Sequence, residues 1–123
     1  MSADPAHGDL AMEKTLERAI DRMLEQLGEA VDLLHHDEVQ VELAPGLLTI
    51  DVGDLDEEPD HTKLIVSRQS ATGQLWLAEP NGGWHFDLKD GLWIDDKRGI
   101  ELTAALEQCL AEALGQPVKL TLD

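Results

Sequence analysis

The chain has 123 residues, 42% of them hydrophobic, which suits one folded domain with a single core and argues against a chain that is disordered as a whole. Its 26 acidic and 9 basic side chains give a formal net charge of −17, which excludes nucleic acid and anionic membranes as favourable partners. Cations, metal ions and basic protein surfaces are the partners that this charge favours.

The cysteine content and the N-terminal residues indicate the cellular compartment of the protein. The single cysteine, Cys109, excludes an internal disulfide and fits a reducing environment. No apolar run has the length of a membrane-spanning helix, and the N-terminal residues resemble neither a signal peptide nor an arginine-rich transit peptide. We therefore expect a cytoplasmic protein, with the mitochondrial matrix as the alternative if a transit peptide has been removed.

Residues 9–34 predict one long amphipathic helix, because apolar side chains recur every three or four residues, and Asp9 is the expected N-cap. Six short strands with alternating apolar and polar side chains should follow, separated by turns rich in Gly, Asn, Asp and Pro. They are expected within VQVEL, LTIDV, TKLIVSR, QLWLAE, WHFDL and LWID. A second helix is predicted over 102–114 and ends at Gly115.

The order helix, six strands, helix predicts an α+β two-layer sandwich, in which both helices pack on one face of a six-stranded antiparallel meander. We expect a single domain over 1–123, with 1–8 as a flexible N-terminus and 115–123 as a C-terminal tail packed on the domain. The acidic segment GDLDEEPDH, residues 53–61, should be a charged connector that is either simply solvated or an additional cation site.

Acidic side chains recur at every fourth residue of the first predicted helix, from Glu13 to Glu29, and form a stripe beside the apolar one. No lysine or arginine lies between Arg22 and Lys63. If the first strand lies beside the helix, its outward acids join the helix acids in one ridge for a hard cation, with His35 and His36 as softer nitrogen donors for ferrous iron. The alternative is a solvated helix face that serves solubility alone.

The sequence contains no persuasive catalytic constellation. The segment DLDEEPD lacks the glycine and the terminal glutamate of an EF-hand loop. A lone cysteine without a histidine pair at helical spacing argues against zinc, and there is neither a nucleophile motif nor a glycine-rich phosphate loop. We therefore expect a binding protein rather than an enzyme.

Three of the four aromatic side chains, Trp76, Trp84 and Phe86, lie within eleven residues. In the fourth predicted strand, Leu75 and Leu77 point to one face and Trp76 to the other. Placing both leucines in the core leaves Trp76 on the open face of the sheet, where an exposed tryptophan is a natural anchor for a protein partner. The alternative is that neighbouring long side chains cover it.

The segment GQLWLAEPNGGWHFDLKDGLWIDDKRG, together with PGLLTI and VSRQ, resembles the frataxin family in its bacterial, CyaY-like form, and the resemblance covers nearly the whole chain. It implies an iron-binding protein of iron–sulfur cluster assembly, which acts as an iron donor or an iron-dependent regulator of the cysteine desulfurase–scaffold complex. The alternative is a ferroxidase and iron-storage protein that oxidises ferrous iron at clustered carboxylates. A third hypothesis is an acidic adaptor without a metal role.

The resemblance also implies two groups of site residues. Ferrous or ferric iron, or another divalent cation, would bind weakly at the ridge, which comprises Glu25, Glu29, Asp32, Asp37, Glu38 and Glu42, with His36 among them. The desulfurase and the scaffold protein would contact the sheet at Trp76, Gln69, Gln74, Arg68 and His85. We expect a monomer, with iron-induced oligomers as the alternative, and no binding to nucleic acid or membranes.

Two features depart from the family pattern. Apolar and histidine side chains replace some of the expected acids between Ala30 and Gln40, so the ridge is sparser. Gly28 lies inside the first helix, where glycine costs up to about 1 kcal/mol of helix stability relative to alanine.

Overall fold

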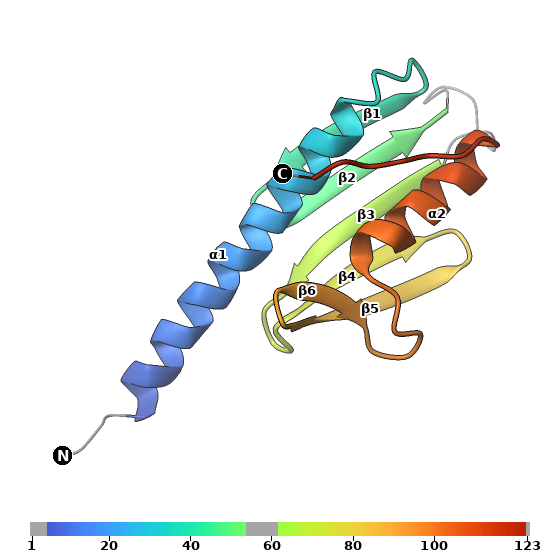
Figure 1. Cartoon of the computed structure of the whole chain (residues 1–123). Coiled ribbons are helices and arrows are strands. Elements are labelled where there is room, and N and C mark those ends of the chain that lie inside the picture. Colours follow the sequence, from blue (N-terminus) through green and yellow to red (C-terminus); the bar gives the residue numbers. More distant parts are fainter. Residues whose placement is uncertain (1–4, 54–61, 123) are drawn as a thin grey trace.

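The computed structural model describes residues 5–53 and 62–122, with side chains from residue 14 onward. The elements follow the chain in the predicted order of helix, six strands and helix (Figure 1). They are α1 (Pro5–Asp32), β1 (Val39–Ala44), β2 (Leu47–Val52), β3 (Thr62–Gln69), β4 (Gln74–Glu79), β5 (Gly82–Lys89), β6 (Leu92–Asp95) and α2 (Leu102–Leu114). The predicted α+β class is confirmed.

The six strands form one antiparallel sheet in which every strand pairs with the next one along the chain, so the predicted meander is confirmed. Tight turns make this order possible. Gly46 has a φ of 69° in the β1–β2 turn, a left-handed conformation that favours glycine. Between β4 and β5, Glu79 pairs with Gly82, so the turn consists of Pro80 and Asn81, and the two glycines that follow belong to β5.

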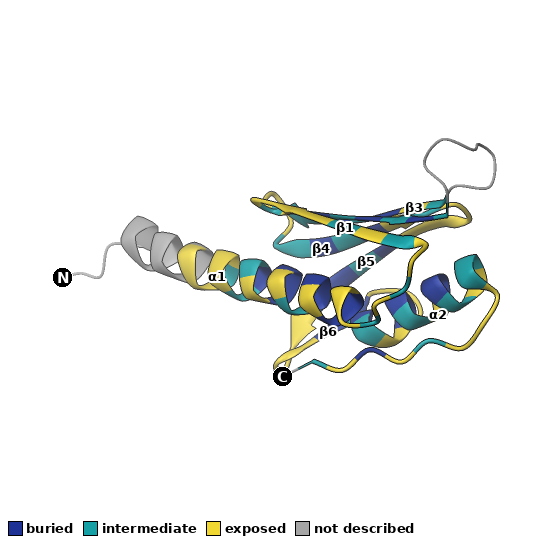
Figure 2. Cartoon of the chain, turned by 90° about the horizontal axis from the view of Figure 1, so that it is seen from above, coloured by how far each residue is buried: buried dark blue, intermediate teal, exposed yellow. Residues whose placement is uncertain are grey.

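Both helices cover the same face of the sheet, with α1 against β1 and β2, and α2 against β2 and β6 (Figure 1). Viewed from above, the buried residues of both helices turn toward the sheet (Figure 2). The core between the two layers consists mainly of aliphatic side chains that are almost completely shielded from water: Ile20, Leu24, Leu27, Leu48, Ile50, Leu64, Leu75, Leu77, Leu102, Leu106 and Leu110, together with Phe86.

The C-terminal tail adds to this core. Leu120 is buried, and its backbone N–H donates a hydrogen bond of 2.7 Å to Oε2 of Glu107 on α2. The tail leaves α2 at Gly115, whose φ of 70° ends the helix as predicted. Residues from both ends of the chain therefore complete the same layer.

The bounds of α1 differ from the expected ones. The helix begins at Pro5, four residues before Asp9, because proline fits a first helical turn, where its missing N–H has no helical partner. It ends at Asp32, because Leu34 and His35 bond to carbonyls three residues back and His35 has a φ of 49°. Residues 1–4 and 54–61 lie outside the described residues, and with them part of the expected flexible start and most of the charged connector.

Gly28 has a packing role in α1. A Cβ atom at this position would lie 3.2 Å from Cδ1 of the buried Leu48 on β2, so glycine allows the helix to approach the sheet closely. Among the described residues, no helix is long and apolar enough to cross a membrane.

Candidate functional site

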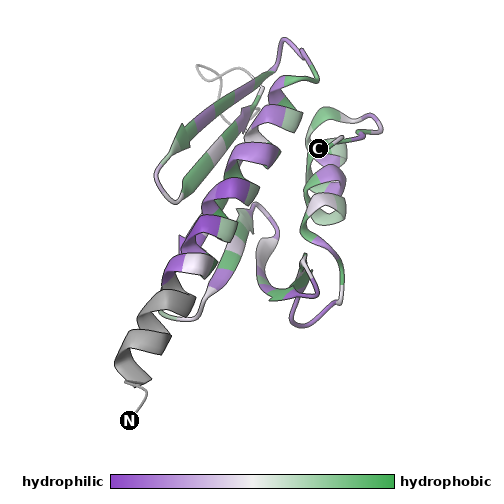
Figure 3. Cartoon of the chain, turned by 60° about the vertical axis from the view of Figure 1, so that its left-hand side comes forward, coloured by the Kyte–Doolittle hydropathy of each residue, from purple (hydrophilic) through white to green (hydrophobic). Residues whose placement is uncertain are grey.

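The candidate metal ligands on α1 are Glu25, Glu29 and Asp32, which are all exposed; these three residues are called the acidic stripe from here on. They line a shallow cavity of about 380 Å³, and Val41 and Leu43 of β1 form its apolar side. A second cavity of about 350 Å³ shares Glu25 and Leu43 and reaches the β1–β2 turn. Figure 3 shows hydrophilic residues along the outer side of α1. The stripe therefore borders a groove between α1 and the edge strand β1.

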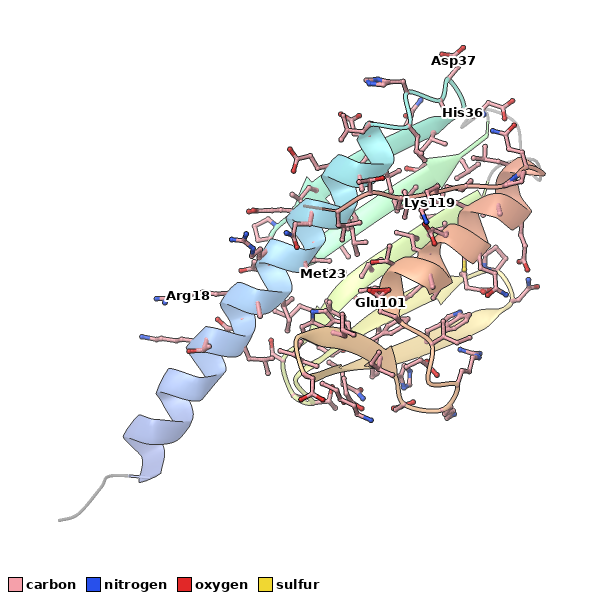
Figure 4. All side chains as sticks on the ribbon, in the orientation of Figure 1. Arg18, Met23, His36, Asp37, Glu101 and Lys119 are labelled. Atoms are coloured by element: carbon pink, nitrogen blue, oxygen red, sulfur yellow. The ribbon has the colours of Figure 1, made fainter. Side chains whose placement is uncertain are left out.

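The other candidate metal ligands lie apart from the stripe. His36 and Asp37 lie beyond the C-terminal end of α1 (Figure 4), and Nδ1 of His36 accepts a hydrogen bond of 3.1 Å from the backbone N–H of Glu38. Glu42 is paired with Thr49, on the sheet face away from α1. The expected single ridge is therefore divided, because successive side chains of β1 point to opposite faces and the valines take the helix side.

The geometry of these acids determines how they can hold a cation. In the part of the chain that the structure describes, no group of three or more His, Cys, Asp or Glu side chains could hold a metal ion. Acids four residues apart on a helix are separated by about one 5.4 Å turn. A cation at the stripe would therefore meet one or two carboxylates and keep most of its water.

The open face of the sheet carries the aromatic pair, Trp76 and His85, from the neighbouring strands β4 and β5. The two rings stack with their centroids 4.3 Å apart and an angle of 17° between their planes. Leu75 and Leu77, on either side of Trp76 in the chain, are fully buried. The predicted placement of Trp76 away from the core is confirmed, although neighbouring side chains leave it half-buried.

Gln74 connects Trp76 to two carboxylates on the open face. Its Oε1 accepts a hydrogen bond of 2.9 Å from the indole Nε1–H of Trp76. Its Nε2 donates to Oδ1 of Asp87 at 3.0 Å and to Oδ2 of Asp96 at 3.2 Å. The amide thus links β4, β5 and the segment that follows β6.

The remaining two candidate partner contacts lie on opposite faces of the sheet. Gln69 lies on the open face, where its Nε2 donates a hydrogen bond of 3.1 Å to Oγ of Ser67. Arg68 pairs with the buried Leu75 and points to the helix side, where its Nη1 lies 3.2 Å from Oδ1 of Asp21 on α1. The structure therefore does not bring Arg68 together with Trp76, because strand alternation places it with the core-facing residues.

Asp87 and Asp96 are site residues that the sequence analysis missed. A signal for Asp87 exists: once Trp76 is placed opposite His85, the hairpin register puts Asp87 on the same face as Gln74. Asp96 follows β6, and no periodic pattern indicates its contact with Gln74.

Asp95 is a buried charged residue on the core face of the sheet. Its carboxylate accepts hydrogen bonds from the backbone N–H groups of His85 at 3.1 Å, Lys97 at 3.0 Å and Arg98 at 2.6 Å. Burial alone would raise the pKa of Asp95, but these hydrogen bonds and the charge of Arg98 hold it below its ordinary value. This arrangement is structural, since it holds the turn after β6 against the backbone of β5 on the core face of the sheet.

Cys109 faces Glu79 at the border of the core. Its thiol donates a hydrogen bond of 3.5 Å to Oε2 of Glu79, which also accepts one of 3.3 Å from Nε1 of Trp84. Burial, assisted by the charge of Glu79, raises the pKa of Cys109 to about 12. The thiol therefore stays protonated and is a poor nucleophile and metal ligand.

Comparison with known proteins agrees with this fold. The family model of the frataxin-like domain matches residues 10–116. A protein of Thioalkalivibrio sulfidiphilus named iron-sulfur cluster assembly protein CyaY is 34% identical over 113 residues, which are 90% of this chain and 94% of that protein. Frataxin from Psychromonas ingrahamii has a TM-score of 0.77 at 28% identity, with 89% of this chain and 97% of that chain covered. The ferrous complex of trimeric frataxin from the yeast Saccharomyces cerevisiae has a TM-score of 0.66 at 27% identity, with 80% and 87% covered. The chain belongs to the frataxin-like family.

Proposed function

We propose that this protein takes part in iron–sulfur cluster assembly, as an iron donor or an iron-dependent regulator of a cysteine desulfurase–scaffold complex. The name of the Thioalkalivibrio relative supports the assembly role, and the ferrous complex of the yeast neighbour supports iron as the metal. The observation that carries the proposal is the pair of separate surfaces on one small domain. The acidic stripe borders a groove on the helix side, and the aromatic pair lies on the open face.

The acidic stripe suits transient contact with iron. Its carboxylates offer negative charge without a closed coordination shell, so an ion bound there exchanges readily. Iron is therefore a cargo or a signal in this proposal. The same acids attract a basic surface on the desulfurase and speed association through long-range electrostatics.

The aromatic pair suits contact with a folded partner. Trp76 offers a large ring, stacked on His85 and hydrogen-bonded to Gln74, on the open face of the sheet, and tryptophan is enriched among residues that dominate binding energy. A ferroxidase, in contrast, needs two metal ions about 3.5–4 Å apart between bridging carboxylates. The described carboxylates offer no such group, and no other observation favours that alternative.

The first experiment measures cysteine desulfurase turnover with its scaffold protein, with and without this protein, while ferrous iron is titrated without oxygen. We expect a change in rate that depends on iron. Glu29→Lys should weaken binding about tenfold at low salt and less at high salt. Glu112→Lys on α2 is the matched control, because it makes the same charge change at an exposed position away from both surfaces.

Equal affinity of the Glu29→Lys variant and the unmodified protein at low salt would remove the stripe from the interface. A rate change that is the same at every iron concentration would favour the acidic adaptor without a metal role. In a separate assay in air-saturated buffer, oxygen consumption in proportion to added ferrous iron would instead establish the ferroxidase.

A further inference from the structure

We propose that Gln74 is a positioning residue, whose amide holds Trp76 in one orientation for a protein partner without contacting that partner itself. The inference rests on the proposed function for the identity of the partner. The orientation of the indole is a property of this chain and can be tested alone.

The argument begins with the types of hydrogen-bonding groups around position 74. The indole Nε1–H of Trp76 can only donate, whereas the ionised carboxylates of Asp87 and Asp96 can only accept. A side chain that satisfies all three must offer an acceptor on one side and two N–H donors on the other. The glutamine amide has this pattern, and its three distances, 2.9, 3.0 and 3.2 Å, show that it is used. Glutamate lacks the donors and lysine lacks the acceptor.

These contacts leave Gln74 little capacity for a partner. Both N–H bonds of its amide are directed to the two carboxylates, and one of the two lone pairs of its oxygen accepts from the indole, so the amide keeps no free donor. The indole of Trp76, in turn, is held at its N–H by Gln74 and on one ring face by His85. A side chain that is already ordered loses less conformational entropy when it binds, which strengthens association.

The charges of Asp87 and Asp96 make the amide donors important. Both carboxylates approach the same nitrogen of Gln74 within 3.2 Å, so they lie close to each other. Without the N–H groups between them, the two negative charges repel each other. A third carboxylate at position 74 would add to this repulsion, so Gln74→Glu should disturb the site more than Gln74→Ala.

The first test follows the three indole N–H signals of Trp76, Trp84 and Trp93 in a ¹⁵N-correlated NMR spectrum, with the signal of Trp76 assigned by Trp76→Phe. We expect Gln74→Ala to shift and broaden the Trp76 signal and to leave the other two in place. Gln69→Ala is the matched control, because Gln69 bonds to Ser67. A Trp76 signal that stays unchanged in Gln74→Ala would overturn the proposal.

The second test exchanges donor and acceptor. In the double variant Gln74→Glu with Asp87→Asn, the carboxylate at position 74 can accept from the indole and from the new amide at position 87. We expect the Trp76 signal to return part of the way toward its original position, since Asp96 keeps its charge. No recovery relative to Gln74→Glu alone would show that the hydrogen-bond pattern does not orient Trp76.

The third test measures binding to the desulfurase–scaffold complex in a double-mutant cycle. We expect Gln74→Ala to weaken binding about threefold to tenfold, as the ordering of one side chain predicts. In the Trp76→Ala background the same change should cost less than about twofold, because a positioning residue acts only through Trp76. Additive losses would show that Gln74 contacts the partner, which overturns the proposal. If Trp76→Ala leaves binding unchanged while the NMR shift persists, the proposed partner surface fails and the positioning of Trp76 stands.

Discussion

Replacing Asp95 by alanine tests a prediction about what holds the end of the sheet together. Asp95 is the last residue of β6 and is only 3% exposed. Its carboxylate accepts hydrogen bonds from the backbone N–H groups of His85, Lys97 and Arg98. Nη1 of Arg98 lies 3.6 Å from its carboxylate, and the guanidinium lies 3.9 Å from the centre of the Trp84 ring. The carboxylate therefore fixes the turn after β6 and a cation that covers part of the core.

The expected loss is about 3 kcal/mol in the free energy of unfolding. The N–H of His85 lies between two strands, and an unpaired donor there costs about 1–3 kcal/mol. Lys97 and Arg98 are in an exposed turn, where water replaces the carboxylate, so each bond there contributes a net amount of only about 0.5–1.5 kcal/mol.

The isosteric change Asp95→Asn separates charge from shape. Asparagine keeps one oxygen for the turn but places its amide N–H₂ toward a backbone donor. We therefore expect Asp95→Asn to lower the free energy of unfolding by about 1.5 kcal/mol, about half of the loss expected for Asp95→Ala. Burial alone would raise the pKa of Asp95, but the backbone hydrogen bonds and Arg98 hold it below the unfolded value of about 3.9. The ionised carboxylate thus makes its full contribution to the stability of the folded protein above about pH 4. This contribution is lost as the pH falls through the lower pKa of the folded state.

Urea unfolding followed by circular dichroism measures both effects. The difference in stability between the unmodified protein and the asparagine variant should be constant near neutral pH and shrink in acid. Because the other carboxylates titrate in both proteins, their contribution to the pH dependence of stability cancels in this difference. A loss below about 1 kcal/mol for Asp95→Ala would refute the argument from unpaired donors, and an acid-independent difference would refute the argument from the pKa.

Three further predictions concern the core. Cys109, with a pKa raised to about 12 by burial and by Glu79, should resist a thiol reagent at mildly alkaline pH and react fully once urea unfolds the chain. Leu120→Ala should cost about 2–3 kcal/mol, whereas Leu33→Ala, at a position that is 63% exposed, should stay within about 0.5 kcal/mol; equal losses would show that the tail does not belong to the core. Gly28→Val should cost about 2 kcal/mol, because its side chain meets Leu48; an unchanged melting temperature would contradict this close approach.

Strand alternation explains why most of the fold and part of the site are predictable. Leu75 and Leu77 can be buried together only if Trp76 points away, so a local pattern is enough to place the tryptophan on the open face. The same rule places Arg68 on the helix side and Glu42 on the open face, which divides the groups that the family resemblance implies. The face of each residue is therefore contained in the strand pattern.

Contacts between segments that are distant in sequence are harder to predict from the sequence. Gln74 meets Asp96 across 22 positions of the chain, and Asp96 belongs to no periodic element. The separation of the acids along α1 also depends on the backbone, since residues with matching charge share a helix face without approaching a common point. Composition therefore predicts the charge of the stripe but not whether it closes around a cation.

The order of the elements also affects how the chain is made. Leu27 of α1 and Leu120 of the tail belong to one core, yet they are 93 residues apart, and translation adds them at different times. At about 5–20 residues per second, roughly 5–20 s pass between the synthesis of Leu27 and that of Leu120, and the apolar face of α1 is incompletely covered during this time. During that interval the like charges of Glu25 and Glu29, beside that face, oppose the association of one nascent chain with another. The acids that border a groove in the folded protein thus also place like charges beside an apolar helix face that is still uncovered.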